Sequence, residues 1–92
     1  HVYRPADGLE VALCYWAALN RRKGPSTLIF TRQNVTPLTR PASFSSDDIL
    51  KGGYIVSDDA QAKLVLVATG SEVNVAVDAA KELSSAGIAA RV

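Results

Sequence analysis

A single arginine follows a short apolar run in the segment Thr31-Arg32-Gln33-Asn34. The run before it, Thr27-Leu28-Ile29-Phe30, is rich in β-branched and aromatic residues and predicts a buried strand. Ligands of open α/β sheets bind beyond the carboxyl ends of the strands, so Arg32 would stand where a ligand arrives. A guanidinium matches a phosphate or a carboxylate with two parallel hydrogen bonds. Arg32 is therefore a candidate anion-binding residue, and the alternative is that it pairs with a neighbouring carboxylate or lies along the surface.

Other residue types that carry chemistry are sparse. His1 is the only histidine, and Cys14 is the only cysteine. Cys14 lies in an apolar stretch with helical character, which favours a buried small hydrophobe over a nucleophile. With one residue of each kind, the sequence offers no Cys/His metal cluster and no Ser-His-Asp arrangement.

The composition is ordinary for a soluble globular protein. The chain has 92 residues, a net charge of +1 and 48% hydrophobic residues, which suits one small domain or part of a larger protein. Its basic residues are scattered apart from Arg21-Arg22-Lys23, which falls at a predicted helix end, so we expect no nucleic-acid partner. No apolar run is long enough to span a membrane and no signal peptide is visible, so we expect no membrane partner. The single cysteine fits a reducing compartment, and a cytoplasmic location is expected.

The first 30 or so residues predict a strand, a helix and a second strand. Val2-Tyr3 is an extended stretch ended by Pro5. Asp7 begins a helix as its cap, with Glu10 positioned to reach back to the cap. The helix runs through residues 11–19, fades at residues 20–22 and is closed by Gly24-Pro25. Because this helix is apolar nearly all round, one face covers a sheet and the other needs a further partner.

The remainder predicts a linker and a second unit of the same kind. Residues 35–60 are rich in proline, serine and aspartate, with one short helical turn near residues 47–50 and a glycine turn at residues 52–53. Residues 63–68 form a continuous apolar run typical of a parallel strand. A helix follows, with Thr69 and Glu72 at capping-box spacing and Gly87 as its stop, and residues 88–92 begin another strand.

The predicted fold class is α/β, with two partial three-layer parallel-sheet βαβ units joined by a linker. Each unit offers only about two strands, whereas a parallel sheet needs several strands and cover on both faces. The sequence also lacks methionine and opens and stops on extended stretches. We therefore expect an excerpt of a larger multidomain chain.

Five short motifs occur in a fixed order along the chain. They are Arg4-Pro5-Ala6-Asp7, Gly24-Pro25, Thr31-Arg32-Gln33-Asn34, Lys51-Gly52-Gly53-Tyr54 and Ala68-Thr69-Gly70-Ser71-Glu72-Val73. Together they resemble transketolase, the thiamine-diphosphate enzyme. The resemblance covers essentially the whole chain, and the ordered set is more specific than any single motif. It implies that residues 1–45 end the pyrimidine-binding middle domain, that residues 46–60 form an interdomain linker, and that residues 61–92 begin the carboxyl-terminal domain.

The resemblance also implies a function. Transketolases transfer two-carbon ketol units between sugar phosphates in the pentose phosphate pathway, as homodimers with thiamine diphosphate and a divalent metal, Mg or Ca. Arg32 matches the family's arginine that binds the substrate phosphate. The family's cofactor-binding motif, its activating glutamate and its active-site histidines have no match here. The resemblance therefore implies no catalytic residue, no cofactor-binding residue and no metal ligand in this chain, and the excerpt alone is expected to bind no cofactor and to be inactive. The alternatives are a related thiamine-diphosphate enzyme, such as dihydroxyacetone synthase or deoxyxylulose-phosphate synthase, and a non-catalytic binding or interaction module.

Overall fold

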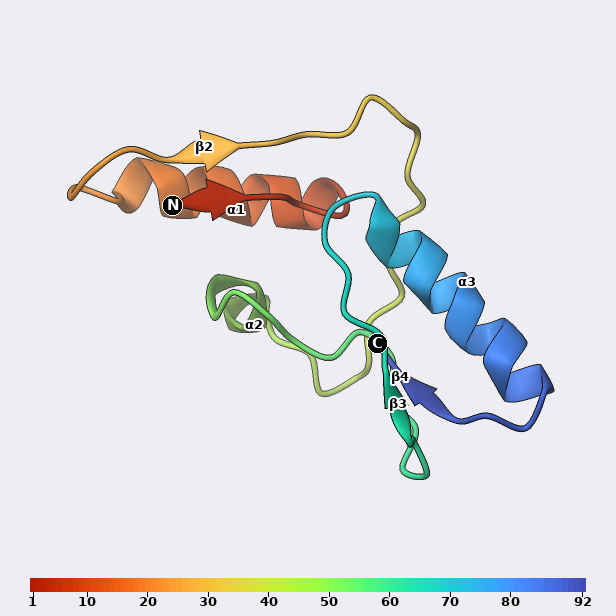
Figure 1. Ribbon diagram of the computed structural model, residues 1–92. Helices are drawn as coiled ribbons and strands as arrows, with labels where there is room; N and C mark the ends of the chain where they lie inside the picture. The colour runs from red at the N-terminus through yellow and green to blue at the C-terminus, as the bar shows by residue number, and fades with distance from the viewer.

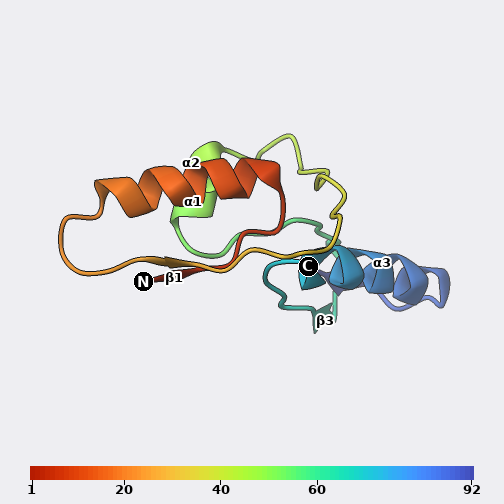
Figure 2. The same ribbon diagram turned by 90° about the horizontal axis from the view of Figure 1, so that it is seen from above.

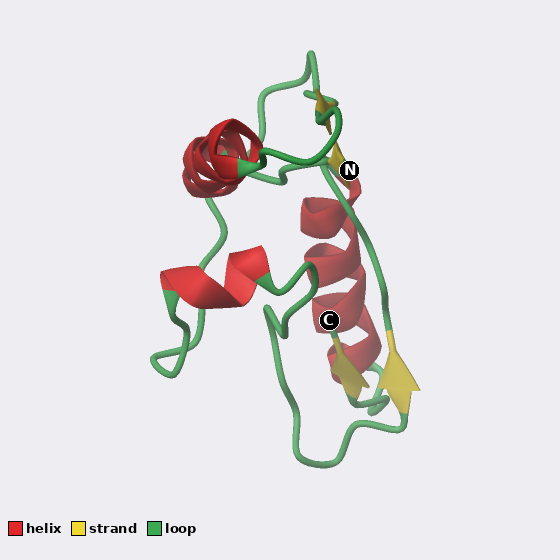
Figure 3. Cartoon of the chain, turned by 90° about the vertical axis from the view of Figure 1, so that its left-hand side faces the viewer, coloured by secondary structure: helices red, strands yellow, loops and turns green.

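A computed structural model describes all residues from 1 to 92. Four short strands pair into two separate parallel sheets, β1 with β2 and β3 with β4 (Figure 1). The two pairs lie at different ends of the molecule (Figure 3). The prediction of two partial parallel α/β units joined by a linker is confirmed. In chain order the elements are β1 (Val2–Tyr3), α1 (Gly8–Asn20), β2 (Thr27–Leu28), α2 (Ser46–Leu50), β3 (Leu64–Val65), α3 (Glu72–Ser85) and β4 (Ala90–Arg91).

The first unit places α1 over the β1–β2 pair (Figure 2). Val2 is in register with Thr27, and Tyr3 with Leu28. Asp7 caps α1 as predicted, since its side chain accepts the N–H of Glu10 at 3.0 Å. The Glu10 carboxylate reaches back as well, but it accepts the N–H of Ala6 at 2.8 Å, one residue earlier than a standard capping box.

The linker contains the predicted helical turn, now bounded as α2. Ser45 is its N-cap, and its side chain accepts a backbone N–H of the first turn. In return, the Asp48 carboxylate accepts the N–H of Ser45 at 2.8 Å. This full capping box begins at Ser45, two residues before the turn that the sequence predicts. The chain then turns at Gly52, whose φ of +90° is a conformation that favours glycine.

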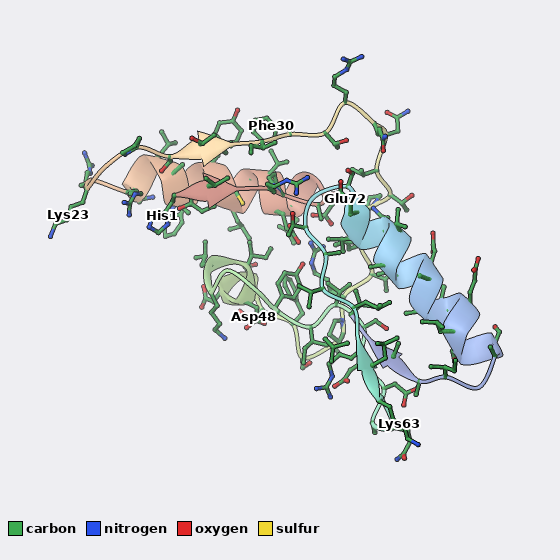
Figure 4. The ribbon with its side chains drawn as sticks, in the orientation of Figure 1. His1, Lys23, Phe30, Asp48, Lys63 and Glu72 are labelled. Atoms are coloured by element: carbon green, nitrogen blue, oxygen red, sulfur yellow. The ribbon has the colours of Figure 1, made fainter.

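The second unit differs from prediction at the start of its helix. The N-cap of α3 is Ser71, not Thr69, and no side chain caps the helix. Gly70 explains the difference, because its φ of +59° turns the chain and removes Thr69 from the helix axis. The Glu72 carboxylate instead lies 3.3 Å from the Arg4 guanidinium, on the side of α3 that faces the first unit (Figure 4). At the other end Gly87, with φ +78°, stops the helix as expected.

The buried core is small and part of it joins the two units. Ala6, Leu38 and Val73 form one cluster, which brings together the start of α1, the linker and α3. A second cluster lies between α3 and β4. The apolar runs of residues 27–30 and 63–68, predicted to be buried strands, are partly exposed in this chain. Phe30 is 45% exposed and Val67 is 90% exposed. Each strand pair has a helix on one face only, so the other face has no cover within these residues.

Several apolar side chains of α1 also face water. Trp16 is 55% exposed and Leu19 is 77% exposed. Tyr15 is partly covered by stacking on Phe30, with the ring centroids 5.6 Å apart. These positions agree with the expectation that one face of this helix needs a further partner. None of the helices has the length and the apolar character that crossing a membrane requires.

Candidate functional site

Arg32 lies on the loop that leaves the carboxyl end of β2. Its side chain is exposed and takes part in no hydrogen bond or ion pair with the rest of the chain. The neighbouring backbone is shaped locally, because the hydroxyl of Thr31 accepts the N–H of Gln33 at 3.0 Å. Gln33 and Asn34 are exposed too. The guanidinium is thus available to an anion, and its role as a phosphate ligand stays a prediction.

The loop of residues 30–37 has few internal restraints. No backbone N–H or carbonyl of these residues takes part in a backbone–backbone hydrogen bond. One hydrogen bond reaches the loop from another element: the side-chain amide of Asn74, on α3, donates to the carbonyl of Thr36 at 3.2 Å. The loop ends at Leu38, which is buried and whose N–H donates to the Asp7 carboxylate at 3.1 Å.

A buried cluster of charged side chains holds this end of the loop. Arg40 donates to both carboxylate oxygens of Asp7, through Nη1 at 2.8 Å and through Nη2 at 3.0 Å. This two-pronged pair is the geometry in which a guanidinium binds a carboxylate best. The Arg40 side chain is 9% exposed and that of Asp7 is 3% exposed, so water screens the pair little.

Glu10 and Tyr54 complete the cluster. Arg40 Nη2 lies 3.3 Å from a Glu10 carboxylate oxygen, and Arg40 Nε donates to the Tyr54 hydroxyl at 2.9 Å. The same hydroxyl donates to Glu10 at 2.6 Å. The Arg40 guanidinium also lies 5.0 Å from the centroid of the Phe44 ring. Every N–H group of the Arg40 guanidinium therefore has a partner, and the start of α1, the segment of residues 38–44 and Tyr54 meet at one point.

The titration of these groups follows from their neighbours. Burial alone would raise the pKa of Asp7, but the hydrogen bonds from Arg40 and from two backbone N–H groups outweigh it, and the pKa is lowered. Burial, together with the hydrogen bond to Glu10, raises the pKa of Tyr54 to about 12. Burial also raises the pKa of the Cys14 thiol, which supports its reading as a structural residue.

Arg40 is the residue that sequence reasoning missed. It sits in the Pro- and Ser-rich stretch that reads as linker, and its partner Asp7 lies 33 residues away in the chain. The role of Asp7 as a helix cap already explained its presence, so nothing in the sequence pointed to a second partner. Tyr54 belonged to a recognised motif, but no local pattern connected it to Glu10. A pairing between distant residues leaves no periodic signal in a single sequence.

No three histidine, cysteine, aspartate or glutamate side chains come together in a way that could hold a metal ion. A hollow of about 1050 Å³ is lined by residues of β1, α1, the glycine turn and β3, and Arg32 is not among its lining residues. The residues of this chain therefore offer no set of ligands for the metal that accompanies thiamine diphosphate.

Two parallel strand pairs, each joined through a helix, define an α/β protein. Comparison with known proteins gives the family. Residues 52–92 match the family model described as the transketolase-like C-terminal domain. The plasmid-encoded transketolase of Cupriavidus necator is 48% identical over 91 residues, and its chromosomal counterpart is 49% identical over 92 residues; each match covers 99% of this chain.

Solved structures agree with the sequence matches. The transketolase of Pichia stipitis in complex with sedoheptulose 7-phosphate superposes with a TM-score of 0.89 at 43% identity, over 99% of this chain and 13% of that one. The transketolase of Leishmania mexicana gives 0.87 at 40% identity, with the same coverage. The chain belongs to the transketolase family. It spans about 13% of the length of the curated relatives it matches.

Proposed function

We propose that this chain is a segment of a transketolase that transfers two-carbon ketol units between sugar phosphates. The observation that carries the proposal is the alignment of 99% of the chain with transketolases at 48% and 49% identity. Thiamine diphosphate and Mg or Ca would be held by parts of the full-length protein outside this segment. A cytoplasmic homodimer in the pentose phosphate pathway belongs to the same proposal, as does the absence of ketol transfer by the segment alone.

The domain boundaries form part of the proposal. Residues 1–45 would end the pyrimidine-binding middle domain, residues 46–60 would be the interdomain linker, and residues 61–92 would begin the carboxyl-terminal domain. Supporting this division, β1 pairs only with β2 and β3 only with β4, so no sheet crosses the linker. The carboxyl-terminal family model begins at residue 52, within the proposed linker.

Arg32 is the proposed phosphate ligand. Three features support it: an exposed guanidinium, no competing carboxylate partner, and a place beyond the carboxyl end of β2. A transketolase that this chain resembles has been solved with a sugar phosphate bound. The phosphate is remote from the bond that breaks, so the contact would contribute equally to the ground state and the transition state.

The test is Arg32→Ala in the full-length protein that carries this segment. Loss of one charge-assisted contact costs about 1.5–3 kcal/mol, or roughly tenfold to a hundredfold in affinity. We expect KM for xylulose 5-phosphate to rise by that factor, with kcat little changed. Hydroxypyruvate has no phosphate and should be used almost normally. Arg32→Lys should restore part of the loss, since a point charge lacks the fork.

Arg22→Ala is the matched control. Arg22 is also exposed and unpaired, but it lies before β2, at the opposite end of that strand from Arg32. The control should leave both substrates unaffected. An equal fall in kcat/KM for xylulose 5-phosphate and hydroxypyruvate in Arg32→Ala would show that Arg32 supports structure and does not bind phosphate.

A further inference from the structure

The loop that carries Arg32 depends on the second unit for its only hydrogen bond to another element. Its upstream end is fixed by β2, where the N–H of Ile29 donates to the carbonyl of Tyr3 at 2.9 Å. Its downstream end is fixed at Leu38 by the Asp7 carboxylate. Between these two points the backbone of residues 30–37 makes no backbone–backbone hydrogen bond. The contact from Asn74 to the carbonyl of Thr36 is the one remaining restraint of this kind.

The placement of α3 supports this contact. Its first turn lies beside the loop where the loop descends toward the linker (Figures 1 and 2). Val73, one residue before Asn74, packs in the cluster with Ala6 and Leu38, so the helix start cannot slide along the loop without opening that cluster. A second bond holds the same junction, since the N–H of Gly70 donates to the carbonyl of Arg4 at 3.0 Å.

We propose that Asn74 is a positioning residue for Arg32, through which the second unit holds the phosphate-binding loop of the first. The inference rests on the proposed role of Arg32 as a phosphate ligand. Asn74 does not touch the substrate. It fixes the Thr36 carbonyl, and with it the downstream half of the loop. The other hydrogen bond between the two anchors is local, from the N–H of Gln33 to the hydroxyl of Thr31. If the loop is already held in its binding conformation, phosphate binding loses less conformational entropy and is tighter.

The experiment measures both substrates in the full-length protein carrying Asn74→Ala. One neutral hydrogen bond changes an equilibrium by roughly twofold to tenfold, so KM for xylulose 5-phosphate should rise by about that factor. The kcat for xylulose 5-phosphate and both constants for hydroxypyruvate should stay unchanged. Asn74→Asp provides a second variant of nearly the same shape. It replaces the donor with a charged acceptor that repels the Thr36 carbonyl, and an acidic side chain suits the first turn of a helix. It should therefore show at least as large a loss as Asn74→Ala without unfolding α3.

Asn20→Ala is the matched control. Asn20 also donates its side-chain amide to a backbone carbonyl, that of Trp16 at 2.8 Å, but at the end of α1 remote from the loop. Asn20→Ala should leave KM and kcat unchanged for both substrates. The decisive measurement combines Asn74→Ala with Arg32→Ala: if Asn74 acts through Arg32, the double variant should be no worse than Arg32→Ala alone.

The outcomes separate the two proposals. If Arg32→Ala is selective for xylulose 5-phosphate but Asn74→Ala changes both substrates equally, or adds its full effect to Arg32→Ala, the positioning role is overturned and the phosphate role stands. An Asn74→Ala protein with unchanged constants for xylulose 5-phosphate overturns the positioning role as well. If Arg32→Ala itself is not selective, the phosphate role fails and the positioning role fails with it.

Discussion

Removing Arg40 should open the junction between the start of α1 and the segment of residues 38–44. Arg40→Ala leaves two carboxylates, Asp7 and Glu10, with side chains 3% and 13% exposed and no cation beside them. Breaking a buried pair by deleting one partner costs about 3–5 kcal/mol, because the other charge stays buried and uncompensated. Asp7 keeps the N–H groups of Glu10 and Leu38, so the lower end, about 3 kcal/mol, is expected. That free energy corresponds to about two powers of ten in an opening equilibrium.

Hydrogen exchange in the full-length protein is the suitable assay, because it reports local opening where a multidomain protein has no single unfolding free energy. The amides of Glu10 and Leu38 both donate to Asp7, and in Arg40→Ala they should exchange about a hundredfold faster. Arg40→Lys keeps the charge but loses the fork, and should fall between Arg40→Ala and the parent.

Arg91→Ala is the control for this experiment. Arg91 pairs with Asp58 at 2.6 Å, but the two side chains are 40% and 48% exposed. Exposed pairs contribute up to about 1 kcal/mol, so this variant should change exchange by less than about sixfold, and only near β4. The amide exchange rates of Glu10 and Leu38 in Arg40→Ala are compared with those near β4 in Arg91→Ala. If the two variants raise exchange equally, the Arg40 cluster does not stabilise this junction as a buried ion pair would.

Two further predictions concern the alkaline limit and the isolated chain. Burial and the hydrogen bond to Glu10 raise the pKa of Tyr54 to about 12 from its ordinary value of 10.0, so this phenol favours folding below pH 10 and the contribution is lost as pH rises toward 12. The test is a pH titration of the phenolate absorbance of the unmodified protein and of Tyr54→Phe. The difference between the two curves reports Tyr54 alone and should have its midpoint near pH 12. A midpoint near pH 10 would contradict the burial of Tyr54 in the cluster. The 92-residue chain expressed alone should bind apolar dyes and show no cooperative melting, because Trp16, Leu19 and Val67 are more than half exposed and only 10 residues are buried. A sharp thermal transition from a monomer of this chain would refute that prediction.

Local signals predicted the elements well because the physics behind them is local. Asp7 caps α1, and Gly87 stops α3, through contacts within a few residues. The α2 turn was visible in Asp47-Asp48, although its capping box starts at Ser45. These features depend on the order of neighbouring residues, which a single sequence displays.

The failures share the opposite cause. Thr69 and Glu72 have the right spacing for a cap, yet Glu72 turns to Arg4, 68 residues away in sequence. Arg40 was read as linker because nothing near it shows that Asp7 is its partner. Arg32 could be proposed from the sequence because its position after a strand and its surrounding motif are both local. Its availability to an anion became visible only when the structure showed that no carboxylate lies against it.

The cluster around Arg40 and the contact from Asn74 act on the same short stretch of backbone. Asp7 holds Leu38 and pairs with Arg40, while Asn74 holds Thr36 two residues earlier. One restraint comes from the first unit and the other from the second. The strengths differ, since the first is a buried, charge-assisted pair and the second a single neutral bond at the surface. We therefore expect Arg40→Ala to disturb both the fold and the loop, and Asn74→Ala to disturb only the loop, which makes Asn74 the cleaner probe of whether the second unit contributes to phosphate binding.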